Sequence, residues 1–228
     1  MAEIIQFGQP PIDVTLRRSA RAKRLSLRVS GLDGQVSLTL PRRGTMGQAE
    51  AFLTEKEPWI RKHIASSVVL RPVGVGHHIP VEGRKRLIVQ GAGRAVSLAE
   101  DALVVPGAED KAAAHVKAFL KTMARDRLVE ASEQYAREIG HPFSKVTLRD
   151  TRSRWGSCTS EGNLMYSWRL ILAPPPVLDY VAAHEVAHLA EMNHSPAFWS
   201  KVESLMPDYQ RPRKWLKTNG THLHSFQF

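Results

Sequence analysis

Hydrophobic and polar residues alternate along much of the first part of the chain, which is typical of strands that bury one face. The alternation is clearest at residues 25–29 and 36–40, and a Gly-Leu-Asp-Gly sequence at 31–34 separates the two segments. Together they predict a β-hairpin. Further short strands, punctuated by glycine and proline, are expected at residues 79–81, 86–90, 95–98 and 102–105.

Two helices are expected between residues 45 and 139. Residues 45–48, Thr-Met-Gly-Gln, match a capping box and predict the start of the first helix. Pro58 is expected to divide it in two, because proline has no amide hydrogen and its ring crowds the preceding turn. Residues 110–139 contain neither glycine nor proline and carry apolar residues at helical spacing, so they predict one long helix ending at Gly140.

The last part of the chain mixes short strands with helices. Strands are expected at residues 145–149, 152–158 and 163–172, and helices should begin near Val177 and at Pro196. The fold class that follows is α+β. We expect a β-rich, basic N-terminal region at residues 1–107 and a second domain at 108–228.

Composition limits the classes of protein. The chain has 228 residues, of which 43% are hydrophobic and 24% charged, as in ordinary globular proteins. Cys158 is the single cysteine, so an internal disulfide and a cysteine-built zinc site are excluded. The sequence shows neither a secretory signal nor an apolar run of the ~18 residues that span a membrane. A cytoplasmic location without membrane association is therefore expected.

Positive charge is concentrated in the N-terminal region. The formal net charge is +10, and residues 1–107 carry 16 Lys and Arg against 9 Asp and Glu. A solvated basic surface explains this excess, and so does an anionic partner such as nucleic acid, a nucleotide or an acidic peptide. The basic segment has no interleaved aromatic residues that would indicate base stacking. Most of the excess lies in Arg17, Arg18, Arg21, Lys23, Arg24, Arg28, Arg42 and Arg43.

Residues 184–188 read His-Glu-Val-Ala-His, and their spacing has a chemical meaning. On a helix, two histidines four residues apart lie one turn from each other on the same face, so both imidazoles can bind one metal ion. Glu185 is then placed to accept a proton from a metal-activated water molecule. The surrounding helix is almost entirely apolar, and unpaired polar groups buried there would be costly. We therefore predict zinc ligands at His184 and His188 and a general base at Glu185.

A catalytic zinc ion takes three protein ligands, and two residues compete for the third position. Glu191 falls on the same helical face as His184 if the helix continues. However, Asn193 can terminate a helix, Ser195 can cap a new one, and Pro196 suits its first position. His194 would then lie on a turn that points back toward the metal. We favour His194, with Glu191 orienting a neighbouring ligand.

Trp155, Gly156, Ser157 and Cys158 form a second unusual cluster. A strand with a buried tryptophan and an inert cysteine explains it. Alternatively, this hairpin, with Tyr166 and Trp168, forms a wall beside the metal and offers an edge strand to an extended substrate. Phe198 and Trp199 are expected to close the back of the site. Hypotheses for the group that stabilises the transition state are Tyr166, Tyr209, Arg152 and Arg154.

These residues resemble the YgjP-like metallopeptidase family, a relative of the SprT-type zinc peptidases. The resemblance runs through residues 17–29, 41–43, 52, 59–60, 153–158, 168–174, 184–188, 193–195 and 198–199. It implies a zincin-like α+β catalytic domain with His194 as the third zinc ligand. The three-histidine spacing also matches that of the metzincins, except that Glu191 stands where they have glycine.

The resemblance favours hydrolysis of peptide bonds in a peptide or protein substrate but leaves two alternatives. Zinc-activated water also attacks phosphorus, and the positive charge suits a nucleoside triphosphate. However, the sequence has no Gly-rich phosphate loop and no Asp-rich magnesium site. The second alternative is a basic nucleic-acid-binding protein with a structural zinc ion, in which Glu185 would have no purpose.

Overall fold

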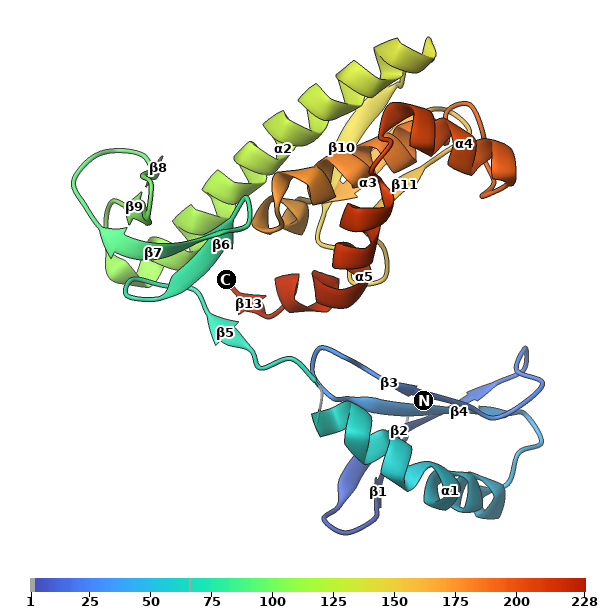
Figure 1. The fold of residues 1–228 in the computed structure, drawn as a ribbon. Coiled ribbons are helices and arrows are strands. Elements are labelled where there is room, and N and C mark those ends of the chain that lie inside the picture. Colours follow the sequence, from blue (N-terminus) through green and yellow to red (C-terminus); the bar gives the residue numbers. More distant parts are fainter. Residues whose placement is uncertain (1–2, 66) are drawn as a thin grey trace. The chain divides into compact units, whose positions relative to one another are not determined.

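The computed structural model describes residues 3–65 and 67–228, and the chain forms two compact units, Met1–Leu70 and Arg71–Phe228 (Figure 1). This boundary lies earlier than the division expected at residues 107 and 108. The strands between residues 78 and 105 share their hydrophobic core with the long helix that follows them, so they belong to the second unit. The chain has an α+β fold, as predicted.

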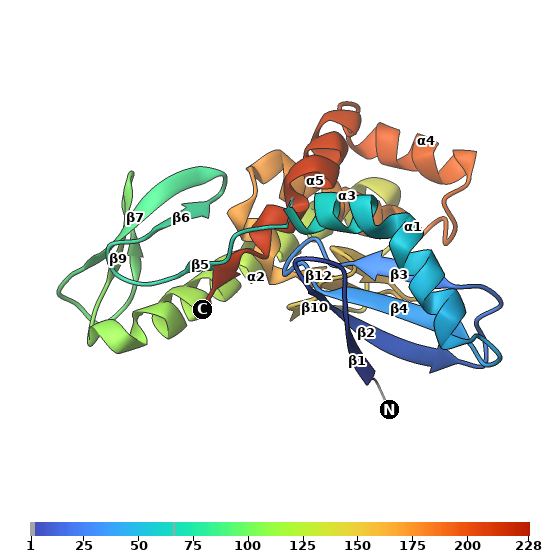
Figure 2. The ribbon, with the colours of Figure 1, turned by 90° about the horizontal axis from the view of Figure 1, so that it is seen from below.

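The first unit is a four-stranded sheet covered by one helix (Figure 2). Its strands are β1 (Glu3–Phe7), β2 (Ile12–Ser19), β3 (Ser26–Val29) and β4 (Val36–Pro41), in the order β1-β2-β4-β3. The hairpin of β3 and β4 confirms the alternating pattern of the sequence, with Leu27 opposite Leu38. Alternate residues of β4 and of the first part of β2 are buried in one core with the helix α1 (Met46–Ala65), namely Ile12, Val14, Leu16, Val36, Leu38 and Leu40.

The capping box of α1 is formed as predicted. The Gln48 amide donates to Thr45 Oγ1 at 3.3 Å, and the Thr45 amide donates to the Gln48 side-chain oxygen at 3.1 Å. The predicted break at Pro58 is wrong, because α1 continues through it to Ala65. Leu53 and Ile60 lie on either side of the proline and are fully buried. Their burial outweighs the single backbone hydrogen bond that Pro58 cannot make.

The second unit is organised along the helix α2 (Ala112–Ile139), which follows a short 3-10 turn, η1 (Glu109–Lys111). A sheet in the order β6-β7-β9-β8 packs near its first turns, and α3 (Pro175–Ala187) lies along its later part (Figure 1). As predicted, α2 ends at Gly140, which adopts a left-handed conformation with φ of 69°. The strands are β6 (His78–Val81), β7 (Arg84–Gln90), β8 (Ser97–Leu98) and β9 (Ala102–Val105).

A three-stranded sheet and three helices complete this unit. The sheet has the order β10-β12-β11, so β11 (Gly156–Cys158) is an edge strand beside β12 (Asn163–Ser167) and β10 (Lys145–Arg149). The strand expected at 163–172 ends at Ser167, because the next five residues form a buried 3-10 helix, η2 (Trp168–Leu172). The remaining elements are α4 (Pro196–Leu205), α5 (Gln210–Leu223), and the pair β5 (Arg71–Pro72) and β13 (Phe226–Gln227).

Arg169 fixes the end of α5 to the three-stranded sheet. Its side chain is buried and donates to both carboxylate oxygens of Asp150, at 2.6 and 3.2 Å. It also donates to the carbonyls of Leu223 and Phe226, both at 3.0 Å. A buried arginine is stable when its donors are paired in this way. Among the described helices, none is long and apolar enough to cross a membrane.

Candidate active site

The helix α3 carries the His-Glu-Val-Ala-His sequence into the interior. Pro175 occupies its first turn, where a missing amide hydrogen has no cost, and the helix ends at Ala187 with His188 as its C-cap. His188 and Glu185 are buried, and His184 is partly buried. The apolar residues of α3 hold it against the core, namely Val177, Leu178, Tyr180, Val181, Ala182, Ala183, Val186 and Ala187.

A sharp turn follows α3 and carries His194. The Ser195 amide donates to the Asn193 side-chain oxygen at 3.1 Å, and Ser195 Oγ accepts from the Phe198 amide at 3.3 Å, which caps α4. The helix α4 begins at Pro196. The chain therefore reverses between the two helices, and His194 lies where the reversal brings it back beside α3.

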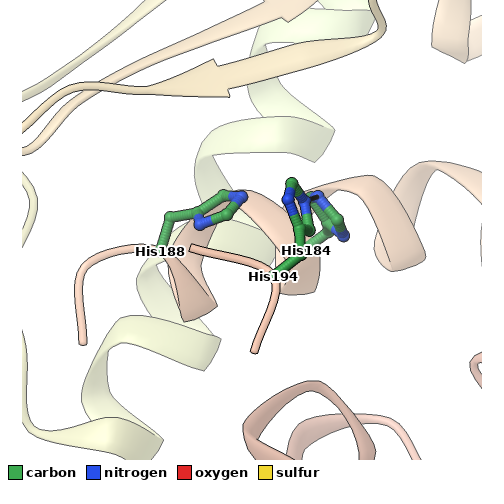
Figure 3. Close-up of side chains that lie close together, drawn as sticks. All are labelled: His184, His188 and His194. Atoms are coloured by element: carbon green, nitrogen blue, oxygen red, sulfur yellow. Dashed lines mark hydrogen bonds between the residues drawn. The ribbon is translucent and has the colours of Figure 1, made fainter. Parts of the chain in front are cut away.

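The three imidazoles converge on one point (Figure 3). One ligand atom from each of His184, His188 and His194 lies within 4.8 Å of the others. The Nε2 atoms of His184 and His194 are 3.1 Å apart. Two nitrogens bound tetrahedrally to zinc at ~2.0–2.1 Å would be about 3.3 Å apart. The spacing of His184 and His194 therefore suits two ligands of a tetrahedral metal ion, and His188 lies within reach of the same ion.

Hydrogen bonding and burial favour the metal-binding form of two of the imidazoles, those of His184 and His188. His188 Nδ1 lies 2.9 Å from the carbonyl oxygen of Glu191. A carbonyl can only accept, so Nδ1 carries the proton and Nε2 keeps its lone pair. Burial, followed by the charges of His188, His194 and Arg213, lowers the pKa of His184 to about 3. Burial also lowers the pKa of His188.

Glu191 contributes its backbone to the site. Its carbonyl orients His188, whereas its carboxylate is not among the clustered ligand atoms of the described residues. The sequence offered both Glu191 and His194 as the third metal ligand, and the structure brings His194 to the other two histidines.

Glu185 lies directly under the edge strand β11. A Cβ atom added to Gly156 would stand 2.5 Å from Glu185 Cγ, so only glycine leaves room for this side chain. Burial raises the pKa of Glu185 to about 8, and the positive charge of Arg154 opposes the rise. A divalent cation at the histidines would favour the ionised carboxylate further.

Aromatic rings surround the histidines. Phe198 is fully buried and stacks on His188, with ring centroids 4.4 Å apart, and the ring of Trp199 lies 5.8 Å from both His184 and His194. Phe198 thus closes the back of the site, as expected. On the far side of Trp199, Tyr209 stacks on its ring at 5.6 Å.

A family comparison agrees with this arrangement. A family model described as the YgjP-like metallopeptidase domain matches residues 23–219. The chain belongs to this family. Among solved structures, the metallopeptidase zymogen abylysin of Pyrococcus abyssi aligns with 44% of this chain and 99% of its own, at 20% identity and a TM-score of 0.37. The comparison with curated proteins gave no match.

In this YgjP-like metallopeptidase chain, the positions of Tyr166 and Cys158 favour structural roles over the functional roles considered for them. Tyr166 is wholly buried and its hydroxyl lies 2.9 Å from Ser132 Oγ on α2, which leaves it no role toward a substrate. Burial, and then Glu185, raise the pKa of the Cys158 thiol to about 11, so it stays protonated and inert. Tyr209 is buried among aromatic rings.

Two features of the site had no clear signal in the sequence. The fit of Glu185 beneath Gly156 depends on how β11 crosses α3, and a single glycine in a short strand does not reveal that crossing. Arg213 lies on α5, a helix that the sequence analysis did not identify, and its guanidinium carbon is 4.2 Å from the centre of the Trp199 ring. A basic residue on an exposed helix face gives no local indication of such a position.

Proposed function

We propose that this chain is a zinc-dependent peptidase in which His184, His188 and His194 hold the metal and Glu185 is the general base. The observation that carries the proposal is the convergence of three imidazoles, the first of which lies one residue away from a buried carboxylate on the same helix. Three protein ligands leave the fourth tetrahedral position open, as catalytic zinc sites require.

Bound zinc supplies Lewis acidity toward the scissile carbonyl and lowers the pKa of an adjacent water molecule to about 7. Glu185 would accept a proton from the attacking water and would then return it to the departing amine. Burial of Glu185 excludes competing solvent from its carboxylate. The proximity of Gly156 keeps the carboxylate in one place, so its geometry is fixed before a substrate binds.

The edge strand β11 is the surface along which an extended substrate lies in this proposal. It pairs with β12 on one side, and its other edge is free of strand pairing within the described sheet. A peptide added there would form main-chain hydrogen bonds irrespective of its side chains. Its scissile bond would pass close to Gly156 and therefore to Glu185.

The substitution Glu185→Gln tests the proposal, because it keeps size and hydrogen bonding but removes the base. We expect it to retain zinc and the far-ultraviolet circular dichroism spectrum, and to lose hydrolysis of an unfolded-protein mixture by ~10²–10⁴-fold. A nucleotide panel assayed in parallel distinguishes the phosphoanhydride alternative. Release of pyrophosphate or phosphate that depends on Glu185, without peptide cleavage, would replace the peptidase proposal.

An anionic partner for the N-terminal region stays a prediction. Because β2 and β4 are parallel, Arg17 and Arg18 near the end of β2 lie at the same end of the sheet as Arg42 and Arg43, which follow β4. Zinc-loaded protein that hydrolyses nothing but retains DNA or RNA in a salt-sensitive manner would favour a binding protein over an enzyme.

A further inference from the structure

Arg213 presents a positive charge beside the three histidines. Its guanidinium group lies against Trp199, whose ring is 5.8 Å from the rings of both His184 and His194. The side chain is exposed, and no carboxylate of the described residues forms an ion pair with it. The indole holds the guanidinium in place without neutralising it.

Arg154 presents a second positive charge near Glu185. It precedes Trp155 and Gly156, so its loop leads directly into the strand that covers Glu185. The Trp155 ring packs against α5, where a Cβ atom at Gly220 would stand 3.0 Å from it. Arg154 is exposed and also has no ion-pair partner among the described residues.

The two arginines therefore belong to one assembly built on α5. Arg213 and Gly220 are seven residues apart on this helix, a distance of about 10 Å. Arg213 lies against Trp199, whose ring is near His184, and Arg154 lies two residues before Gly156, which covers Glu185, the next residue of α3. Two unpaired cations thus lie near adjacent residues of the site.

The charge balance indicates what the two cations bind. The carboxylate of Glu185 is buried under β11, and no carboxylate of the described residues forms an ion pair with either arginine. A divalent metal would make the site more positive still. Arginine suits carboxylates in particular, because its planar donors match the two oxygens of the group.

We propose that Arg213 and Arg154 bind a carboxylate of the substrate, so that the peptidase is selective for peptides with an acidic group close to the scissile bond. This inference rests on the proposed peptidase function. The carboxylate is either an Asp or Glu side chain or the free C-terminus of a short peptide, and the two sources share the same chemistry. An arginine hydrogen-bonded to a carboxylate favours the acidic substrate about 10- to 100-fold in kcat/KM.

The test uses zinc-loaded full-length protein and a matched set of peptides with one common cleavable core. Asp and Glu are placed singly at each position around the cleaved bond, and Asn and Gln replace them in the neutral members. In one arm the acidic side chain is present and the C-terminus is amidated. In the other arm the side chains are neutral and the C-terminus is free. The arm that shows the preference identifies the source of the carboxylate.

The variants Arg213→Gln and Arg154→Gln should each reduce the preference for the acidic peptides, mainly through KM. Cleavage of the neutral peptides should fall by a smaller factor, so the ratio of the acidic to the neutral rate is the quantity that tests the inference. Arg213→Glu should reverse the preference toward peptides with lysine at the same position. Arg211→Glu is the matched control, because Arg211 is exposed on the opposite face of α5 and its change alters the net charge equally.

The outcomes separate this inference from the proposed function. Cleavage of acidic and neutral peptides at equal rates by the wild type overturns the inference and leaves the peptidase standing. An equal loss of rate on all peptides in Arg213→Gln also overturns it, and would assign this arginine to stabilisation of the transition state. If the wild type cleaves no peptide, the proposed function fails first.

Discussion

The two units differ in whether they bury polar groups. The core of the first unit consists of nine apolar residues between Ile12 and Ile60. Every buried polar or charged residue of the described chain lies in the second unit, namely Arg86, Ser132, Ser167, Arg169, Glu185, His188, His224 and Ser225. The first unit is held by apolar burial and a local helix cap, whereas the second buries groups that cost free energy unless they have partners.

Within the second unit, most buried polar side chains have partners, and a proposed metal ligand is among the exceptions. Arg169 and Ser132 have hydrogen-bond partners nearby and serve the fold. By contrast, His184 Nδ1 and Ser167 Oγ are buried without a hydrogen-bond partner among the described residues, and Glu185 is buried without an ion pair. A buried unsatisfied group costs ~1–3 kcal/mol. Part of this cost falls at the positions where the chemistry is proposed.

The largest expected effect is the loss of metal from the second unit. His194→Ala should lower zinc affinity by more than the ~10–100-fold that loss of an outer hydrogen-bond partner costs. Glu191→Ala should retain zinc, because only its backbone carbonyl touches the site. Metal content after dialysis against a weak chelator measures both. Full zinc in His194→Ala together with loss in Glu191→Ala would show that the third ligand is Glu191.

The next effect compares two glycines, one in each unit. Gly156→Ala places a methyl group against Glu185, so the carboxylate must move, and a displacement of ~1 Å costs about 10²-fold in rate. Gly47→Ala in α1 meets no atom within 4 Å and should stabilise the helix by ~0.5–1 kcal/mol without changing hydrolysis. Equal activity of both variants would contradict the fixed position of Glu185.

A third effect appears in the pH dependence of the metal-free protein. The pKa of Glu185 is raised from 4.5 to about 8, so its burial becomes unfavourable as the pH rises through this range. The free energy of unfolding of Glu185→Gln minus that of the wild type should therefore increase from pH 4.5 to 8, by a few kcal/mol in order of magnitude.

A second titrating group of the same helix, His184, has to be accounted for in this comparison. The pKa of His184 is lowered to about 3, so its contribution is lost as the pH falls below 6.5. That loss occurs in both proteins and cancels in the difference. Urea unfolding at several pH values provides the measurement, and a difference that stays constant from pH 4.5 to 8 would contradict the burial of an ionisable Glu185.

The smallest effect concerns the first unit. Thr45→Ala removes half of the capping box and should lower the free energy of unfolding of this unit by about 1 kcal/mol. Thr54→Ala is the control, because this exposed threonine bonds only to the Glu50 carbonyl within α1. Neither change should alter zinc content. Chemical unfolding compares the two, and equal stability of the variants would contradict the role of the cap.

The sequence was informative where structure is decided locally. The hairpin of β3 and β4, the capping box at Thr45 and the end of α2 at Gly140 all depend on neighbouring residues, and they were predicted correctly. The continuation of α1 through Pro58 was not, because burial on both sides of the proline is a tertiary effect. The strand expected at 163–172 also failed, since buried residues of η2 resemble a strand in composition.

The candidate site shows the same contrast between features set by neighbouring residues and features set by tertiary packing. The spacing of His184 and His188 on one helix face is local, and the turn that carries His194 follows from capping signals at Asn193 and Ser195. The neighbours from other elements, Gly156 and Arg213, depend on how β11 and α5 cross α3. Such crossings are set by the packing of the whole unit, and no short motif encodes them.

The hydrogen bond from His188 to the carbonyl of Glu191 has a consequence for dynamics. The same short turn supplies the acceptor that orients one proposed ligand and carries another, His194. Occupancy of the metal and order in residues 189–195 are therefore thermodynamically linked: each increases the other by the same factor. Amide hydrogen exchange in this turn should slow as zinc is added, so that the turn reports occupancy before any substrate is present.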